Sequence, residues 1–310
     1  MSITIHDIAR LAGVNASTVS RALRGDPRVR AETVRSIRAI ADREGYVPNR
    51  NARSLISGRT GVVWLVLASL ESELERAVAG FLAEAVRRHG RELLIAPAGN
   101  TETNFRLLLE RLRQRTADGV VLIPSCSPLP ESCYAALPGL PVPVVCIDRW
   151  YPDAPAVVAN DNVGAVEELA RRCLEAGARR FYLVFSGVNP VAAERFEAAR
   201  RYLERRHIPW SSDPAILNDG APGILGNSER EALLILQQNG LLPPLKGTLC
   251  GGFFDWIDPL TADCFRMRCV CLQDFETMAQ TASRMLAERI EHTGIPPEFR
   301  RIPVREIRFA

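Results

Sequence analysis

The sequence predicts an all-α head at the amino terminus, followed by an α/β core of two lobes. Three observations predict this fold class. The first 47 residues hold three short stretches with apolar residues at helical spacing. Residues 61–310 are long enough for two α/β lobes of ordinary size. Within them, short β-branched runs alternate with longer helical stretches, which is typical of parallel sheets with crossover helices.

Two short helices joined by a tight turn come first. The helix Ile5–Ala12 has one apolar stripe, and Thr4 is placed to cap its amino end. Gly13 tolerates the positive φ of a sharp turn. Asn15 is placed so that its side chain accepts hydrogen bonds from the next helix, which starts at Ala16. This arrangement is a helix-turn-helix, a motif that reads DNA.

The second helix separates core residues from surface residues. The residues expected to face the core are Val19, Ala22 and Leu23. The residues expected on the outer side, near the amino end, are Ala16, Ser17, Ser20 and Arg21. Side chains at such positions reach base edges in a major groove. The alternative is an ordinary three-helix packing unit that binds no nucleic acid.

A third helix, Ala31–Glu44, completes the head and ends at Gly45. Its core-facing residues are Val34, Ile37, Ile40 and Ala41. Charge favours DNA binding, because residues 1–60 contain eleven arginines and five acidic residues. The remaining residues contain 28 lysines and arginines and 31 acidic residues. Positive charge is therefore concentrated at one end of the chain, as the neutralisation of phosphates requires.

The core begins with a strand and helix series. Its predicted strands are Val62–Ala68, Glu92–Pro97, Gly119–Pro124 and Val142–Ile147, and its predicted helices are Leu74–His89 and Thr103–Arg115. A second series follows the run Ala156–Ala159. Its predicted helices are Val163–Ala176, Val191–Arg206, Ser228–Asn239 and Phe275–His292, and its predicted strands are Phe181–Phe185, Ala215–Leu217, Thr248–Gly251 and Arg268–Leu272. We expect two Rossmann-like lobes joined by crossing segments.

Ligands of such sheets bind beyond the carboxyl ends of the strands, where loops meet. The candidate effector-binding residues there are Ser69, Asp148, Arg149, Trp150, Asp161, Arg195, Asp255 and Gln273. Acidic and amide groups beside an aromatic ring suit a hydroxyl-rich ligand, because each carboxylate accepts from two hydroxyls. The alternative is structural: Asp161 only caps the helix that starts near Val163, and Arg195 pairs with a surface acid.

Several classes of protein and site are not expected. The eight cysteines include no CxxC pair, and the four histidines are dispersed, so we expect buried reduced thiols and neither disulfides nor a metal site. No Gly-rich phosphate loop or Ser-His-Asp spacing indicates an enzyme or a cofactor. No signal peptide or apolar run of transmembrane length is found, so we expect a cytoplasmic protein without a membrane partner.

Four runs near the amino terminus, Ile5–Val14, Ser17–Leu23, Gly45–Asn49 and Ala52–Leu55, resemble the LacI/GalR family of transcriptional repressors. The resemblance implies a homodimer that binds a double-stranded, pseudo-palindromic operator and is switched by a small, sugar-like effector. The core is similar to periplasmic sugar-binding proteins. The implied domains are the head at 1–47, a hinge helix and linker at 48–60, and the effector-binding and dimerisation core at 61–310.

The resemblance also assigns roles to residues. Ala16, Ser17 and Arg21 fall on the family's principal base-reading positions, and Leu55 corresponds to a leucine wedged into the minor groove. The DNA-binding residues predicted in all are Thr4, Ala16, Ser17, Thr18, Ser20, Arg21, Asn49, Arg50, Ala52, Arg53 and Leu55. In the core, Arg195 resembles the family's effector arginine, and Asp161 with Asn162 resembles its Asp-Asn step.

The chain departs from the family at four places. Arg30 stands where the family usually has the serine that caps the third helix. Loss of this cap lowers the stability of the helix by about 1 kcal/mol unless another group replaces the serine oxygen. Trp64 replaces a glycine, and Ser69–Glu73 replaces an Asn-Pro-Phe-type segment. The second lobe is expected to lack about one βα unit, with Gly251–Trp256 in place of a Gly-Phe-Asp step. An alternative function is therefore a DNA-binding regulator whose shortened core is an effector-less dimerisation or protein-interaction scaffold.

Overall fold

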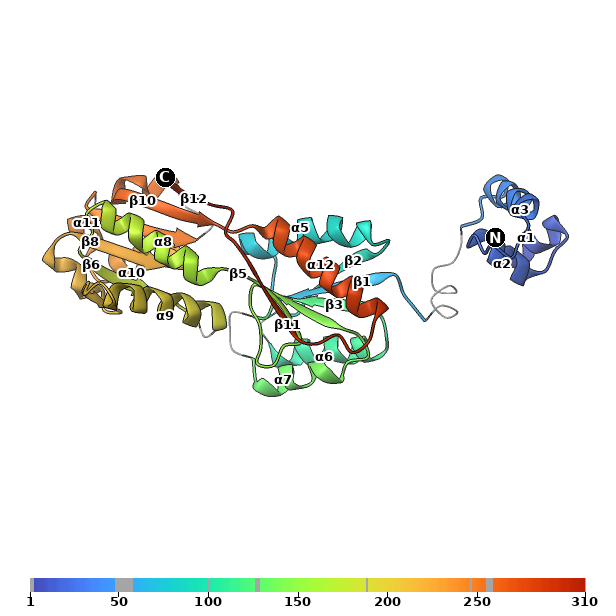
Figure 1. Ribbon diagram of the computed structural model, residues 1–310, viewed down its shortest axis with the longest axis horizontal. Coiled ribbons are helices and arrows are strands. Elements are labelled where there is room, and N and C mark those ends of the chain that lie inside the picture. Colours follow the sequence, from blue (N-terminus) through green and yellow to red (C-terminus); the bar gives the residue numbers. More distant parts are fainter. Residues whose placement is uncertain are drawn as a thin grey trace. The chain divides into compact units, whose positions relative to one another are not determined.

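The computed structural model describes residues 3–47, 58–99, 101–125, 129–187, 189–245, 247–254 and 259–309. The chain divides into two compact units, Met1–Thr60 and Gly61–Ala310. The first unit is an all-α head, and the second is an α/β core of two lobes (Figure 1). The predicted fold class is confirmed.

The head contains the helices α1 (Ile5–Ala12), α2 (Ala16–Leu23) and α3 (Ala31–Arg43). Their shared core consists of Ile8, Ala9, Val19, Ala22, Ile37 and Ala41. Thr4 caps α1 through a capping box, in which its side chain accepts from the Asp7 N–H and its own N–H donates to Asp7 Oδ2 at 3.0 Å. Gly13 has the expected positive φ of 63°. Gly13 thereby allows the sharp turn between α1 and α2.

The N-caps of α2 and α3 make no side-chain hydrogen bond to their helices. Arg30 is the N-cap of α3 and makes no side-chain cap bond, as expected from its replacing a serine. Asn15 is the N-cap of α2, but the prediction that its side chain accepts a cap hydrogen bond is wrong. Its backbone carbonyl instead accepts from the N–H groups of Thr18 and Val19, which begins the helix without the side chain.

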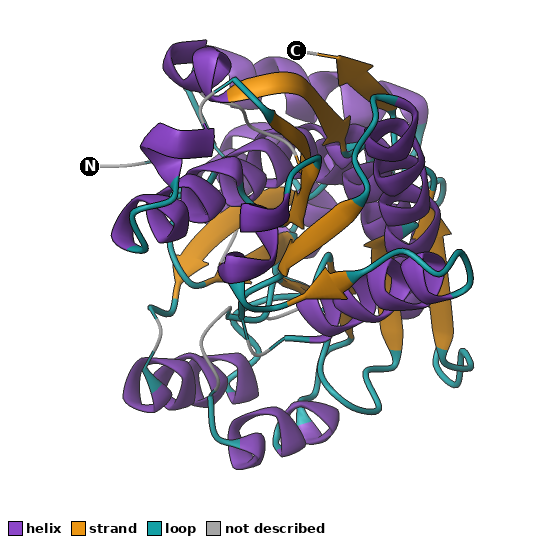
Figure 2. Ribbon diagram, turned by 90° about the vertical axis from the view of Figure 1, so that its left-hand side faces the viewer, coloured by secondary structure: helices purple, strands orange, loops and turns teal. Residues whose placement is uncertain are grey.

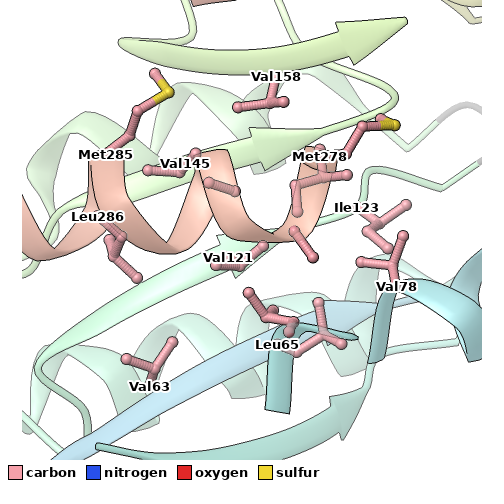
Figure 3. Close-up of a cluster of buried hydrophobic side chains, with 14 of the residues drawn as sticks. Val63, Leu65, Val78, Val121, Ile123, Val145, Val158, Met278, Met285 and Leu286 are labelled. Atoms are coloured by element: carbon pink, nitrogen blue, oxygen red, sulfur yellow. The ribbon is translucent and has the colours of Figure 1, made fainter. Parts of the chain in front are cut away.

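The first lobe is built on a parallel six-stranded sheet with the order β11-β5-β4-β3-β1-β2. The strands are β1 (Val62–Leu67), β2 (Glu92–Pro97), β3 (Gly119–Leu122), β4 (Val144–Ile147), β5 (Ala156–Asn160) and β11 (Glu298–Ile302). The helices α5 (Glu73–Arg88) and α12 (Phe275–Glu291) cover one face, and α6 (Glu102–Arg113) and α7 (Glu131–Ala135) cover the other (Figure 1). The aliphatic layer under α12 and α5 includes Val63, Leu65, Val121, Val145, Met278 and Leu286 (Figure 3).

The second lobe has a six-stranded sheet with the order β12-β10-β9-β8-β6-β7. The strands are β6 (Arg180–Val184), β7 (Trp210–Ser211), β8 (Pro222–Gly226), β9 (Leu249–Phe254), β10 (Phe265–Leu272) and β12 (Glu306–Phe309), of which only β12 pairs antiparallel. The helices α8 (Asn162–Glu175) and α9 (Pro190–Glu204) pack on one face, and α10 (Glu229–Gln238) and α11 (Leu242–Leu245) on the other. Helices therefore flank the strands of both lobes (Figure 2).

One prediction about the second lobe needs correction. The predicted strand Ala215–Leu217 is wrong, because these residues lie in the 3-10 helix η2 (Pro214–Asp219), and the neighbouring strand is β8. The expected loss of about one βα unit relative to the family stays a prediction; the second sheet has six strands, like the first. The described part of the connection from β9 to β10 is a 3-10 helix, η3 (Pro259–Cys264).

The chain crosses between the lobes along three segments, 160–162, 272–275 and 302–306 (Figure 1). The last of these joins β11 to β12, two strands that the sequence analysis did not expect. All seven described cysteines are free, and all but Cys264 are buried. Trp64 is also buried, in the layer between β1 and α6. Among the described residues, no helix combines the length and the apolar character needed to span a membrane.

Candidate nucleic-acid interface and ligand cavity

The outer side of α2 presents a mixture of exposed and half-buried side chains. Ser17 and Arg21 are exposed, whereas Thr18 and Ser20 are half-buried. Ala16, expected on the outer side, is half-buried and packs against the head core. Ser17 and Arg21 are therefore the side chains best placed to reach a partner from this helix.

Arginines give the head a positive surface. Exposed arginines occur on or beside α2 and α3, at Arg21, Arg24, Arg30, Arg35 and Arg38. In the loop between these helices, Arg28 Nη2 donates to Asp26 Oδ2 at 2.7 Å. The hydrogen bonds from Arg28 hold the pKa of the Asp26 carboxyl well below its usual range, so this loop stays ion-paired at neutral pH. The surface therefore combines fixed loop geometry with charges suited to phosphate groups.

Of the predicted hinge helix and linker at 48–60, residues 48–57 lie outside the described residues. The predicted DNA contacts of this segment, Asn49, Arg50, Ala52, Arg53 and Leu55, lie outside the described residues, and so does Asp255 of the predicted effector site. The predicted cap residue Thr4 is exposed, and its hydroxyl donates to Asp7 Oδ2 at 2.7 Å.

A cavity of about 290 Å³ lies between the lobes of the core. It opens at the carboxyl ends of β4, β6, β8 and β10, as the rule for open α/β sheets predicts. Its lining residues are Leu74, Asp148, Arg149, Ser186, Gly187, Asn189, Val191, Arg195, Asn227 and Gln273. Polar groups thus surround a space of the size that a small ligand needs.

Arg195 enters the cavity from α9 and is held from several sides. Its Nε donates to Asn162 Oδ1 at 2.8 Å, its Nη1 to Asn227 Oδ1 at 3.0 Å and its Nη2 to Gln273 Oε1 at 3.3 Å. Its guanidinium carbon lies 3.4 Å from the ring centroid of Phe254. The side chain is only 5% exposed. Side-chain amide oxygens and an aromatic face therefore hold this cation rigidly at the cavity wall.

A second charged group enters from the turn after β4. Arg149 Nη2 lies 2.5 Å from Glu75 Oε1, and Arg149 Nε lies 3.6 Å from Asp148 Oδ2. Asp148 has a positive φ of 64°, a conformation that Asp adopts more readily than most residues. This turn places a carboxylate and a guanidinium side by side at the cavity, and either can bind hydroxyl or charged groups of a ligand.

The structure brings four of the predicted effector residues together and places three elsewhere. Asp148, Arg149, Arg195 and Gln273 line the cavity. The three that do not line it are Ser69, Trp150 and Asp161. Asp161 caps α8 by accepting from the Gly164 N–H at 3.0 Å, the structural alternative considered for it. Trp150 instead packs edge-on against Phe299, with ring centroids 5.0 Å apart.

Sequence reasoning missed several lining residues. Ser186, Gly187 and Asn189 follow β6, and Asn227 follows β8. The carboxyl-end rule would have found the first three, because the strand before them was predicted. It could not have found Asn227, because β8 was not. No group of three or more His, Cys, Asp or Glu side chains able to hold a metal occurs among the described residues.

Comparison with known proteins gives the head and the core the same relatives. A family model described as "Bacterial regulatory proteins, lacI family" matches residues 4–49. The regulator PtxS of Pseudomonas putida is 28% identical over 66% of this chain, and the Maltose regulon regulatory protein MalI of Escherichia coli is 29% identical over 68%. The alignments cover 60% and 62% of those two proteins, so the chain matches less than two thirds of their lengths.

Solved structures support the fold over nearly the whole chain. The Lac repressor dimer bound to operator has a TM-score of 0.77 and 18% identity, covering 98% of this chain and 97% of that one. The complex of the regulator CelR with cellobiose has a TM-score of 0.63 and 20% identity, covering 99% and 98%. A Cra regulator of Pseudomonas putida in complex with fructose 1-phosphate has a TM-score of 0.62 and 20% identity, covering 81% and 98%.

Proposed function

Because the chain belongs to the LacI family of bacterial regulatory proteins, we propose that it is a sequence-specific, DNA-binding transcriptional regulator. It acts as a repressor that binds a pseudo-palindromic operator as a homodimer, and it catalyses no reaction. The observation that carries this proposal is the helix-turn-helix, with Ser17 and Arg21 exposed on α2 amid exposed arginines. The protein works in the cytoplasm, where its DNA is.

Salt-dependent DNA binding is the first test. Purified full-length protein is incubated with random double-stranded oligonucleotides over a range of salt concentrations. We expect retention that falls steeply as salt rises, because arginines displace counterions from phosphates. Selection of bound sequences and footprinting should then yield sites with dyad symmetry. Absence of any salt-sensitive retention would contradict the proposal.

We also propose that a small sugar-like ligand binds in the cavity between the lobes. Asp148, Arg149 and Arg195 offer charged groups there, and Asn227 and Gln273 offer amides. Relatives of the same fold include complexes with cellobiose and fructose 1-phosphate. The ligand acts through its different affinities for the lobe arrangements that do and do not favour operator binding. A thermal-shift screen with sugars and sugar phosphates tests this, since a ligand that binds only the folded state raises Tm.

The second candidate is an effector-less regulator whose core is a dimerisation or interaction scaffold. One observation favours it: the Arg195 guanidinium already donates to three side-chain amide oxygens of the protein and stacks on Phe254. The same thermal-shift screen separates the candidates. A flat response to every sugar and sugar phosphate, in a protein that binds DNA, would favour the scaffold.

A further inference from the structure

The three crossing segments between the lobes lie side by side. The Asp161 N–H donates to the Ile302 carbonyl at 2.8 Å, which joins segment 160–162 to segment 302–306. The Arg305 N–H donates to the Leu272 carbonyl at 2.9 Å, which joins segment 302–306 to segment 272–275. Any change in the angle between the lobes must deform these segments together.

Arg195 of the cavity wall binds two of the crossing segments through side chains. Its Nε donates to Asn162 in the first segment, and its Nη2 donates to Gln273 in the second. Gln273 Oε1 also accepts from Asn160 Nδ2, back in the first segment. Arg195 is thus hydrogen-bonded to two of the segments that must deform when the angle between the lobes changes.

Glu194, the residue before Arg195 on α9, binds Arg301 of β11, which directly precedes the third crossing segment. Arg301 Nη1 lies 2.9 Å from Glu194 Oε2, and Arg301 Nη2 lies 2.5 Å from Glu194 Oε1. Asn162 Nδ2 donates to the same Oε2 at 2.9 Å, and Arg301 Nη1 reaches the Asn160 carbonyl at 3.3 Å. These bonds close a ring, the crossing ring, whose members are Asn160, Asn162, Glu194, Arg195, Gln273 and Arg301.

The pair of Glu194 and Arg301 spans the two lobes. Arg301 lies on β11, in the sheet of the first lobe, whereas Glu194 lies on α9, which packs on the sheet of the second. A two-bond arginine–carboxylate contact is strong and demands one relative orientation of its partners. The Glu194 side chain is 19% exposed and the Arg301 side chain is 40% exposed, so the strength of this contact comes from its two-bond geometry and not from burial. Rotation of one lobe against the other breaks the contact.

We propose that Glu194 and Arg301 are positioning residues that fix the angle between the lobes and orient Arg195 in the cavity. Because Glu194 is adjacent to Arg195 and bound to the same Asn162, a ligand that moves Arg195 changes the crossing ring and hence the lobe angle. The part of this inference that concerns a ligand rests on the proposed function. The part that concerns the lobe angle is tested without ligand or DNA.

Hydrogen exchange of the full-length, ligand-free protein tests the ring. The reporters are the amides of Asp161 and Arg305, which bond across the crossing segments. In E194Q and in R301M we expect their exchange to accelerate about tenfold, equivalent to about 1.4 kcal/mol. R301K keeps the charge but not the two-bond geometry, so it should fall between R301M and the unmodified protein.

Two matched variants serve as controls. E197Q removes a carboxylate one turn further along α9, where Glu197 pairs with Arg200 and Arg201. R300M removes the neighbouring arginine of β11, which pairs with Glu298. Both should leave exchange at Asp161 and Arg305 unchanged, because neither residue belongs to the crossing ring.

The outcomes separate clearly. Exchange that rises only in the crossing segments, with the double variant E194Q/R301M no faster than the faster single variant, supports the proposal. Unchanged exchange at both reporters overturns it. A rise that is equal in β9 and β10 also overturns it, because that result marks general destabilisation. Failure here leaves salt-sensitive DNA binding intact, so it is distinguishable from failure of the proposed function.

Discussion

Arg21 is the long, exposed side chain of α2, and a guanidinium can donate two hydrogen bonds to the major-groove edge of a guanine. We therefore predict that Arg21→Ala weakens operator binding by about 1–3 kcal/mol and relaxes the preference for one base in each half-site. Titration of the selected operator and of its single-base variants measures both effects. Equal weakening on every sequence would instead identify a phosphate contact and contradict base reading.

Arg30 is a poor N-cap, and the head offers an easy repair. A serine at this position can accept a hydrogen bond from a free N–H in the first turn of α3, which Arg30 does not do. Arg30→Ser should therefore stabilise the head by about 1 kcal/mol. Calorimetry of the full-length protein measures the head transition, and Arg35→Ser, an exposed position inside α3, is the control expected to give no gain. An unchanged head transition in Arg30→Ser would contradict the prediction.

The described thiols are protected by burial. Burial raises the pKa of Cys133 and of Cys146, so both stay protonated at neutral pH. Cys264 is the one described cysteine that is partly exposed. In native protein at pH 7.5, we predict that a thiol reagent modifies Cys264 before the other described cysteines, and that mass spectrometry of the labelled peptides shows this order. Early modification of Cys146 would contradict it.

At the scale of elements, the sequence was informative where local signals agreed. The head was predicted well because Thr4, Gly13 and Gly45 mark the start or the end of amphipathic helical stretches. The strand β8 was missed because its sequence, Pro222–Gly226, begins and ends with residues that usually disfavour strands. It forms because it pairs with β6 on one side and with β9 on the other. Its last residue is a glycine because the neighbouring strand leaves no room for a side chain: a Cβ on Gly226 would lie 2.7 Å from Val184 Cγ1. Such tertiary crowding leaves no local signal.

The candidate cavity was predictable to the same extent. Asp148 and Gln273 directly follow strands that were predicted, and both line the cavity. Ser69 also directly follows a predicted strand, and Trp150 lies three residues after one, but neither lines the cavity. A residue that follows a strand is a candidate for the cavity wall. Whether its side chain points into the cavity depends on the backbone conformation of the turn. The crossing ring could not be predicted, because it joins residues more than 100 positions apart, such as Glu194 and Arg301.

The short connection from β9 to β10 is held by a buried ion pair. Arg268 Nη1 lies 3.0 Å from Glu229 Oε1, and Thr261 of η3 also donates to that oxygen. Glu229 is 1% exposed. Glu229→Gln should destabilise the core by about 3 kcal/mol, because it removes the negative charge beside a buried cation.

Urea unfolding followed by circular dichroism measures this loss. Glu231→Gln, on the same helix and half-buried, should change the free energy of unfolding by less than about 0.5 kcal/mol. If the two variants unfold at the same urea concentration, the pair does not hold the connection as we infer.

At the scale of the whole molecule, each lobe has its own sheet covered on both faces, and in the described part of the chain three segments join the lobes. We therefore expect that, once the crossing ring opens, the lobes rotate against each other more easily than either sheet deforms. A ligand that contacts Asp148 from one lobe and Arg195 from the other can therefore favour one angle at little cost elsewhere. For such a ligand to regulate DNA binding, a change in the lobe angle must also change how the subunit contacts a second subunit.

The edge of the first sheet is suited to meet that subunit. The edge strand β2 exposes Leu94 and Ile95, which are 42% and 38% exposed, and the adjacent α5 exposes Phe81 at 39%. An apolar edge strand tends to pair unless it is covered or charged. We predict that Leu94→Glu, which puts a charge on this edge, converts dimers to monomers in sedimentation velocity at micromolar concentration.

Loss of the dimer should also cost DNA affinity, since two heads held together bind two half-sites at high effective concentration. For Leu94→Glu we expect operator affinity to fall by about 100-fold or more. Leu107→Glu is the matched control, because Leu107 is 53% exposed but lies on α6, over the opposite face of the sheet from α5. It should keep both the dimer and the affinity. A Leu94→Glu protein that remains dimeric would place the subunit contact on another surface, and the lobe angle would then have to reach the partner by another path.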